Sequence, residues 1–252
     1  PFIYIYGGMK CAENIPRQTG RRPCALREEP GEKTMLEQYK TVLEDGEGEI
    51  TEKKSRFIAT VRHVESEEEA LAFIEEMRKK YWDARHNCYV YSVGLNREYT
   101  RCSDDGEPSG TAGRPMLDVI LGEEIYNTAV VVTRYFGGVL LGTGGLVRAY
   151  SKAVQEGLKA SRIIEKKKGI SLEVTTDYTG IGKIQYIAGE RGIPVLNSEY
   201  TDKVKLELLA PAGDVDALQK AITEGTNGRA RMEKKGELYF AVLDGEVHTF
   251  CS

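Results

Sequence analysis

Cysteine, histidine and long apolar runs are all scarce in this chain, and each scarcity excludes a class of protein. The five cysteines are odd in number and never form a Cys-x-x-Cys pair, which argues against a disulfide framework and a structural zinc site. His86 and Cys88 share one face of an expected strand, but the other ligands of a metal site are missing. No apolar run approaches the ~20 residues that cross a bilayer, so we expect a reduced, soluble, cytoplasmic protein without a membrane partner.

The charge of the chain is small overall but unevenly distributed. At 252 residues with a net charge of −4, the molecule does not present a basic surface on every side, and we expect no sequence-specific DNA reader. Residues 134–168 hold eight Lys or Arg against two Asp or Glu, whereas residues 103–124 hold one against six. Such polarity is compatible with a basic face for RNA or another anion, and solvated helix faces are the alternative.

The chain divides into an extension and two patterned regions. Residues 1–34 show no hydrophobic period, and we expect a mobile extension, ahead of a true start at Met35. Residues 35–161 read as one domain, in which Ser66 and Glu69 form a capping box. Its expected strands lie at 39–43, 50–53, 57–61, 87–93, 98–102 and 129–132, and its expected helices follow Ser66 and cover 116–121 and 143–161.

The last part of the chain follows a second rhythm. Residues 169–244 predict the order β-α-β-β-α-β, with Asp214 as the N-cap of the second helix and paired strands at 229–232 and 238–243. The charged run 162–168 separates the two domains, and we expect Lys166, Lys167 and Lys168 to form a solvated linker.

A glycine-rich stretch joins the strand at 129–132 to the helix that follows it. Glycine lets the backbone approach a ligand closely, and a helix N-terminus attracts anions, so this turn predicts a phosphate or anion site. A tight structural connection is the alternative, because the stretch lacks both the Walker A ending and the dinucleotide fingerprint. Tyr135 either stacks on a base or lies in the core. The candidate binding residues are Arg134, Tyr135, Gly137, Gly138, Gly142, Thr143, Gly144, Gly145, Arg148 and Lys152.

A second glycine-rich loop covers residues 103–114 and carries three carboxylates. Asp104 and Asp105 either hold Mg²⁺ beside substrate phosphates or belong to a hydrated turn. No nucleophile has an identifiable partner, so no catalytic residue is assigned. We expect this loop and the first one to converge in a cationic hollow lined by free main-chain amides. The residues assigned to this second part of the site are His86, Asn87, Asp104, Asp105, Glu107, Ser109, Gly110, Thr111 and Arg114.

Five segments of the chain resemble the YigZ/IMPACT family. They are residues 52–57 (EKKSRF), 83–88 (DARHNC), 103–117 (SDDGEPSGTAGRPML), 132–138 (VTRYFGG) and 142–150 (GTGGLVRAY). The resemblance implies an α+β protein whose N-terminal domain is like the fourth domain of elongation factor G. It also implies a C-terminal ferredoxin-like split βαβ domain. Eukaryotic relatives act in translational control through a domain that this chain lacks, and bacterial members have no settled activity.

These observations lead to competing expectations of function. The first is a non-enzymatic RNA- or ribosome-associated modulator of translation that binds the phosphate backbone through the glycine-rich basic site. The alternative is a Mg-dependent nucleotide-binding protein or small-molecule phosphotransferase that uses the same loop. A third is a protein-interaction module on the C-terminal sheet. The sequence leaves the ligand and the oligomeric state open.

Overall fold

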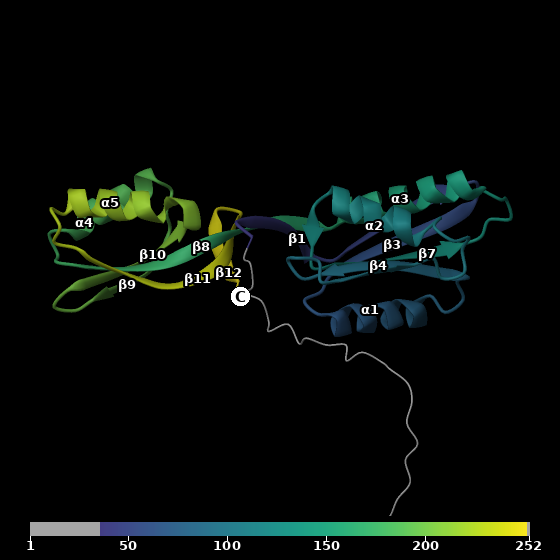
Figure 1. Ribbon diagram of the computed structural model, residues 1–252, viewed down its shortest axis with the longest axis horizontal. Helices are drawn as coiled ribbons and strands as arrows, with labels where there is room; N and C mark the ends of the chain where they lie inside the picture. The colour runs from purple at the N-terminus through teal and green to yellow at the C-terminus, as the bar shows by residue number, and fades with distance from the viewer. Residues whose placement is uncertain (1–35, 251–252) are drawn as a thin grey trace, which may run out of the picture. The chain divides into compact units, whose positions relative to one another are not determined.

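The computed structural model describes residues 36–250, so the expectation for residues 1–34 lies outside the described residues. The described chain is an α+β protein with two sheets (Figure 1). The strands are β1 (Gln38–Glu44), β2 (Gly46–Glu52), β3 (Ser55–His63), β4 (His86–Val93), β5 (Tyr99–Ser103), β6 (Ile125–Tyr126), β7 (Thr128–Tyr135), β8 (Arg162–Thr176), β9 (Val195–Tyr200), β10 (Val204–Pro211), β11 (Arg231–Leu243) and β12 (Glu246–Phe250). The helices are α1 (Glu67–Lys80), α2 (Gly113–Gly122), α3 (Thr143–Ala160), α4 (Ile181–Glu190) and α5 (Val215–Gly225), with a 3₁₀ turn at Ala212–Asp214.

The five-stranded sheet has the order β2-β3-β7-β4-β5, and each neighbouring pair is antiparallel. Helices α2 and α3 cover one face and α1 covers the other (Figure 1). Strand β7 is buried on both faces, which explains its continuous apolar run. Val130 and Val132 belong to the core under α2 and α3, while Ala129 and Val131 belong to the core over α1.

Helix α3 lies close against β2 and β3 because glycines face each other at their contact. A Cβ on Gly48 would overlap the backbone of Glu156. A Cβ on Gly157 would lie 3.0 Å from both Ala59 Cβ and Val61 Cγ2. The helix axis can therefore approach the strands more closely than larger side chains permit.

The seven-stranded sheet has the order β12-β11-β8-β1-β6, and β10 and β9 continue from β8. The order β8-α4-β9-β10-α5-β11 is the predicted β-α-β-β-α-β arrangement. Helices α4 and α5 lie on one side of the strands β8 and β10 (Figure 1). Leu172, Val174, Leu206 and Leu208 point into the core that these helices close.

The predicted linker at residues 162–168 is wrong, because this run is the first half of the single strand β8. Its first residues pair with β1, and its later residues pair with β10. Lys166 is buried, with Nζ 4.1 Å from the centre of the Phe250 ring, and Lys168 pairs with Glu237 at 2.9 Å. Contacts with neighbouring strands thus accommodate lysines that the sequence predicted to be solvated.

Other details of the sequence prediction need smaller changes. The two strands expected at 229–232 and 238–243 are one strand, β11, and β12 was not expected. Helix α2 begins at Gly113, three residues before its predicted start. The hydroxyl of Ser66 accepts the N–H of Glu69 at 3.2 Å, and the Glu69 carboxylate accepts the N–H of Glu65 at 2.7 Å, so the predicted helix start is confirmed.

We expect Gly48→Ala to lower the free energy of unfolding by about 1–3 kcal/mol, because the added methyl group forces α3 away from β2. Urea unfolding followed by circular dichroism measures the change. Gly122→Ala is the matched control, since the space at Gly122 is open and alanine at a helix end is neutral or stabilising by up to ~1 kcal/mol. Equal stability of the two variants would contradict the close contact.

Candidate functional site

The two glycine-rich loops converge at one end of the five-stranded sheet. Arg134 is the last residue but one of β7, and the neighbouring strand β4 begins with His86, directly opposite Arg134 in the register. Alternation places His86, Cys88 and Arg134 on the face that α2 and α3 cover. The loop at residues 104–112, between β5 and α2, brings Glu107 to Arg134 and His86. The expected convergence of the two loops is therefore present in the structure.

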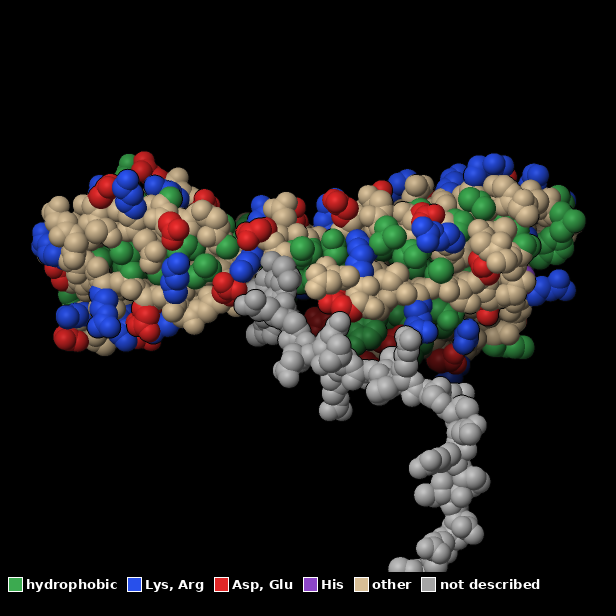
Figure 2. All heavy atoms as spheres, viewed as in Figure 1, with side chains coloured by type: hydrophobic (Ala, Val, Ile, Leu, Met, Phe, Trp, Pro, Cys, Tyr) green, Lys and Arg blue, Asp and Glu red, His purple; other side chains and the backbone are tan. Residues whose placement is uncertain are grey.

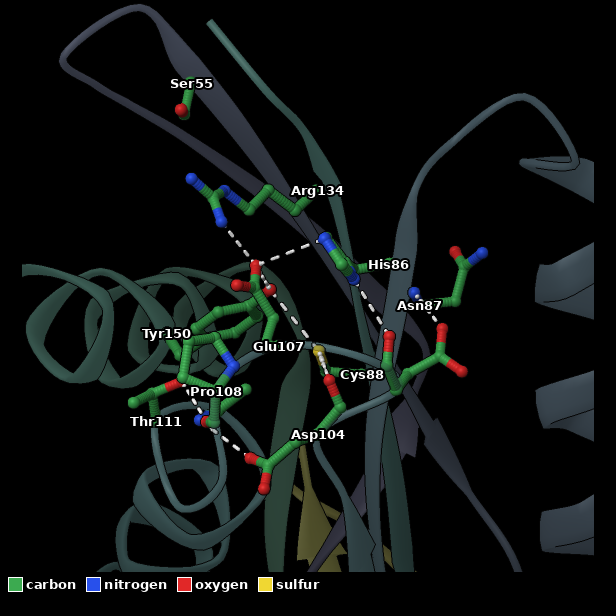
Figure 3. Close-up of polar contacts among 12 residues, drawn as sticks. Ser55, His86, Asn87, Cys88, Asp104, Glu107, Pro108, Thr111, Arg134 and Tyr150 are labelled. Atoms are coloured by element: carbon green, nitrogen blue, oxygen red, sulfur yellow. Dashed lines mark hydrogen bonds and ion pairs between the residues drawn. The ribbon is translucent and has the colours of Figure 1, made fainter. Parts of the chain in front are cut away.

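A buried ion pair between Glu107 and Arg134 lies at the centre of this convergence. Nη1 of Arg134 donates to Oε1 of Glu107 at 2.5 Å, and both side chains are more than nine-tenths buried. The guanidinium carbon lies 5.4 Å from the centre of the Phe57 ring and 5.6 Å from that of Phe136. Figure 3 shows Arg134 and His86 both pointing toward Glu107. The charge of Arg134 is thus neutralised inside the protein.

Tyr150 and Cys88 complete the buried polar network. The Tyr150 hydroxyl donates to Glu107 Oε1 at 2.9 Å, and Cys88 Sγ lies 3.3 Å from that hydroxyl and 3.0 Å from the carbonyl oxygen of Asp104. Burial raises the pKa of the Cys88 thiol, and burial together with Cys88 and Glu107 raises the pKa of Tyr150. Both groups are therefore neutral at physiological pH, and Cys88 is not an activated nucleophile.

Asp104 caps the loop and the start of α2. Its Oδ1 accepts the N–H groups of Ala112 and Gly113 at 2.9 and 2.8 Å, and its Oδ2 accepts that of Gly110 at 2.8 Å. Burial by itself raises the pKa of this carboxyl, but the three backbone donors outweigh it and hold the pKa below its ordinary value. The charged carboxylate thus supplies the cap that Ala112, at the N-cap position, cannot.

Asp105 links the same loop to the start of β4. Its Oδ2 accepts the N–H of Asn87 at 2.7 Å, and its carbonyl oxygen lies 2.9 Å from His86 Nδ1. That contact assigns the proton to Nδ1 and turns Nε2 toward Glu107, at 3.9 Å from Oε1. The side chain of Asn87 points to the opposite face of the sheet and accepts from the Thr133 hydroxyl at 2.7 Å.

The other residues of the second loop have local roles or face solvent. Thr111 donates through its backbone and its hydroxyl to the carbonyl of Pro108 at 3.1 and 2.6 Å. Arg114 pairs with Asp118 at 2.8 Å, and Ser109 and Gly110 are exposed. Within residues 36–250, no group of three or more His, Cys, Asp or Glu side chains is placed to hold a metal ion. The Mg²⁺ site at Asp104 and Asp105 stays a prediction.

These contacts correct the expected chemistry of the converging loops. The meeting point is not a cationic hollow lined by free amides, because Glu107 neutralises Arg134 and Asp104 binds the amides of Gly110, Ala112 and Gly113 in the second loop. Sequence reasoning did not place Tyr150 or Cys88 in this network. Their signal was positional, since Tyr150 lies on the apolar stripe of α3 and Cys88 alternates with apolar residues of β4.

The glycine loop after β7 is fixed to the rest of the protein at Gly137 and is exposed beyond it. Gly137 has no room for a side chain against the backbone of Lys54, and its N–H donates to the Ser55 hydroxyl at 3.2 Å. Tyr135 is not in the core, because it is half-buried and its hydroxyl donates to Asp83 at 2.8 Å, and stacking of this ring on a base stays a prediction. Beyond these contacts, Phe136, Val139 and Leu140 are exposed, and Leu140 is 82% exposed.

Unpaired cations surround this exposed loop. Among the described residues, no side chain caps the first turn of α3; the turn contains no acidic residue, and Gly142, with φ of 75°, is its N-cap. Figure 2 shows Lys and Arg side chains over α3 and apolar side chains at the adjoining end. We call this region the loop-end surface. It consists of loop 136–142, the first turn of α3, and the exposed cations Lys53, Lys54, Arg148 and Lys152, none of which forms an ion pair within residues 36–250.

We expect Glu107→Gln to lower the free energy of unfolding by about 3–5 kcal/mol, because the change leaves the buried guanidinium of Arg134 without a counter-charge. Chemical unfolding of both proteins measures the loss. Glu156→Gln, which removes the exposed partner of Lys159, is the control and should change stability little. A Glu107→Gln protein as stable as this control would show that the ion pair does not hold the loops.

We expect Asp104→Asn to cost about 1–3 kcal/mol near neutral pH, since the amide offers an N–H group where the carboxylate accepts one. The folded pKa of Asp104 lies below 3.8, so its contribution is complete above that pH and is lost as the pH falls through the folded value. Unfolding of both proteins across an acid series should therefore show the difference shrinking below about pH 4. A constant difference at every pH would contradict a charged cap.

Two regions of the chain match known protein families. Residues 53–158 match the Impact N-terminal domain, and residues 174–229 match a domain of unknown function, DUF1949. None of the helices within residues 36–250 is both long and apolar enough to cross a membrane.

Whole proteins with similar sequences bear the same family name. IMPACT family member YvyE of Bacillus subtilis is 43% identical over 206 residues, which cover 82% of this chain and 94% of that protein. IMPACT family member YigZ of Escherichia coli is 35% identical over 182 residues, covering 71% and 89%. A crystal structure of a hypothetical protein, 31% identical, matches with a TM-score of 0.51 over 80% of this chain and 99% of that one. With relatives this similar along nearly their full lengths, the chain belongs to the IMPACT family.

Proposed function

We propose that this protein binds RNA, as part of the ribosome or in association with it, and thereby modulates translation. The observation that carries the proposal is the loop-end surface, where Lys53, Lys54, Arg148 and Lys152 are exposed and form no ion pair with any residue that the structure describes. Such cations contact phosphates without first breaking an internal salt bridge. The family resemblance supports the role in translation, since eukaryotic relatives act in translational control and the fold it implies is that of elongation factor G domains.

The start of α3 strengthens the case for phosphate as the ligand. In the described part of the chain, no side chain caps the first-turn N–H groups, and Nη1 of Arg148 lies 3.6 Å from the position that a Cβ on Gly144 would take. The partial positive charge of the helix end and the full charge of Arg148 therefore act at one place. Thr143, Gly144 and Gly145 leave the backbone open to a ligand oxygen.

The exposed rings and apolar side chains of the loop suit RNA better than a small anion. Phe136 and Leu140 are exposed beside the cations, and Trp82, next to the Asp83 that binds Tyr135, is 82% exposed. Unstacked bases bind to such side chains while the backbone lies against Lys and Arg. Arg134 has a different role from the one that the sequence predicted: it holds the two loops together, and its exposed neighbours contact the ligand.

The test is binding to purified bacterial ribosomes and to a labelled single-stranded oligoribonucleotide across a salt series. We expect log K to fall linearly with log salt, and Arg148→Gln with Lys152→Gln to reduce the slope by about 1.4, at ~0.7 for each single-strand phosphate contact. Lys159→Gln with Arg114→Gln is the matched control, because it removes two exposed cations that are already paired with Glu156 and Asp118.

Two results would refute the proposal. One is the absence of binding to ribosomes and to RNA at low salt. The other is a Arg148→Gln, Lys152→Gln protein whose salt slope equals that of the control. A loss shown equally by both variants would mean that the net charge of the protein, and not this surface, drives the association.

A further inference from the structure

The sheet face that α4 and α5 leave uncovered carries a charged groove. Figure 1 shows both helices on one side of β8, β10 and β11, and no helix of the described chain covers the other side. Figure 2 shows Lys, Arg, Asp and Glu side chains along that opposite side. The groove has a volume of about 570 Å³ and is lined by Glu173, Thr175, Thr176, Asp177, Lys203, Lys205, Arg229, Arg231 and Glu233.

The register of the strands arranges the cations of this groove in two rows. Lys205 of β10 and Arg231 of β11 both pair with Thr175 of β8, one from each side. Two strand spacings separate them, which is about 10 Å. Lys203 and Arg229 extend the rows by two residues beyond Lys205 and Arg231. The groove therefore runs along β8 with cations on both sides.

The carboxylates of the groove already have hydrogen-bond or ion-pair partners in the protein, whereas its cations form no ion pair within the described residues. Glu173 and Glu233 share the ammonium of Lys235, each at 3.5 Å. Asp177 accepts the Thr179 hydroxyl at 2.6 Å and the N–H of Gly180 at 2.8 Å, and these bonds lower its pKa. In contrast, Lys203, Lys205, Arg229 and Arg231 form no ion pair within residues 36–250.

We propose that this groove binds the phosphodiester backbone of single-stranded RNA, as a second contact independent of the loop-end surface. Two rows of unpaired cations about 10 Å apart can contact one strand from both sides, which is the arrangement that tracks a nucleic-acid backbone. The guanidinium planes of Arg229 and Arg231 also offer faces for unstacked bases. The hydroxyl of Thr175 on the floor of the groove provides an acceptor for a ribose hydroxyl group, which inorganic polyphosphate lacks.

The proposal rests on the proposed function in taking RNA as the ligand, and its own variants separate the two. The experiment measures anisotropy of a labelled single-stranded oligoribonucleotide with the full chain across a salt series. We expect Lys205→Gln with Arg231→Gln to weaken binding and to lower the salt slope by about 1.4, at ~0.7 per phosphate. The control is Lys183→Gln with Lys220→Gln, which removes two exposed cations from α4 and α5 on the covered side.

The pattern across variants decides each claim separately. If the salt slope of Lys205→Gln with Arg231→Gln equals that of the unchanged protein or of the control, the groove does not bind RNA. This holds even when Arg148→Gln with Lys152→Gln loses affinity. The reverse pattern supports the groove and refutes the loop-end surface. If Lys205→Gln with Arg231→Gln loses as much affinity for an RNA duplex of the same sequence as for the single strand, single-stranded RNA is overturned as the ligand. Full competition by inorganic tripolyphosphate at the same phosphate concentration overturns it as well. Circular dichroism of each variant confirms that it is folded.

Discussion

The ion pair between Arg134 and Glu107 is the interaction on which the arrangement of both loops depends. One partner lies near the end of β7 and the other lies in the loop before α2, so a single contact joins two separate segments of the chain. Tyr150 of α3 binds the same carboxylate oxygen, which ties the helix to both. A buried charge without its partner is costly. The arrangement of the loops is therefore maintained mainly because separating Arg134 from Glu107 would leave a buried charge unpaired.

The buried pair also determines what is left at the surface. Since Arg134 pairs with Glu107 and Asp104 binds amides of the second loop, the phosphate contacts that we propose fall to residues without an ion pair in the described part of the chain, such as Arg148 and Lys152. The buried polar network and the exposed basic surface thus have complementary roles. The interior positions the loops, and the exterior has the charges that a polyanion needs.

The sequence predicted much of the fold, because most elements follow local signals. The capping box at Ser66, the apolar run of β7 and the helix from Thr143 depend on neighbouring residues alone. The failure at Lys166 has a different cause: its burial depends on Tyr39 and Phe250, which come from opposite ends of the described chain. Tertiary pairing overrode a charge pattern that, taken locally, indicates a linker.

For the candidate site, the sequence identified the right segments and assigned several residues the wrong contacts. Composition revealed two glycine-rich loops, but not which carboxylate meets Arg134, because that choice depends on how each loop folds. Asp104 is turned inward by three backbone donors, and Glu107 reaches the guanidinium instead. The groove on β8 has no sequence signature at all, since strand register alone aligns Lys205 with Arg231.

The position of β1 has a consequence for how the chain is made. Its hydrogen-bonding partners, β6 and β8, are both far downstream, so β1 leaves the ribosome long before either exists. Until β8 has emerged, β1 is a bare edge that any other extended segment can capture. Biosynthesis of this protein therefore includes an interval in which β1 waits for β8, and shielding by a chaperone would matter most then.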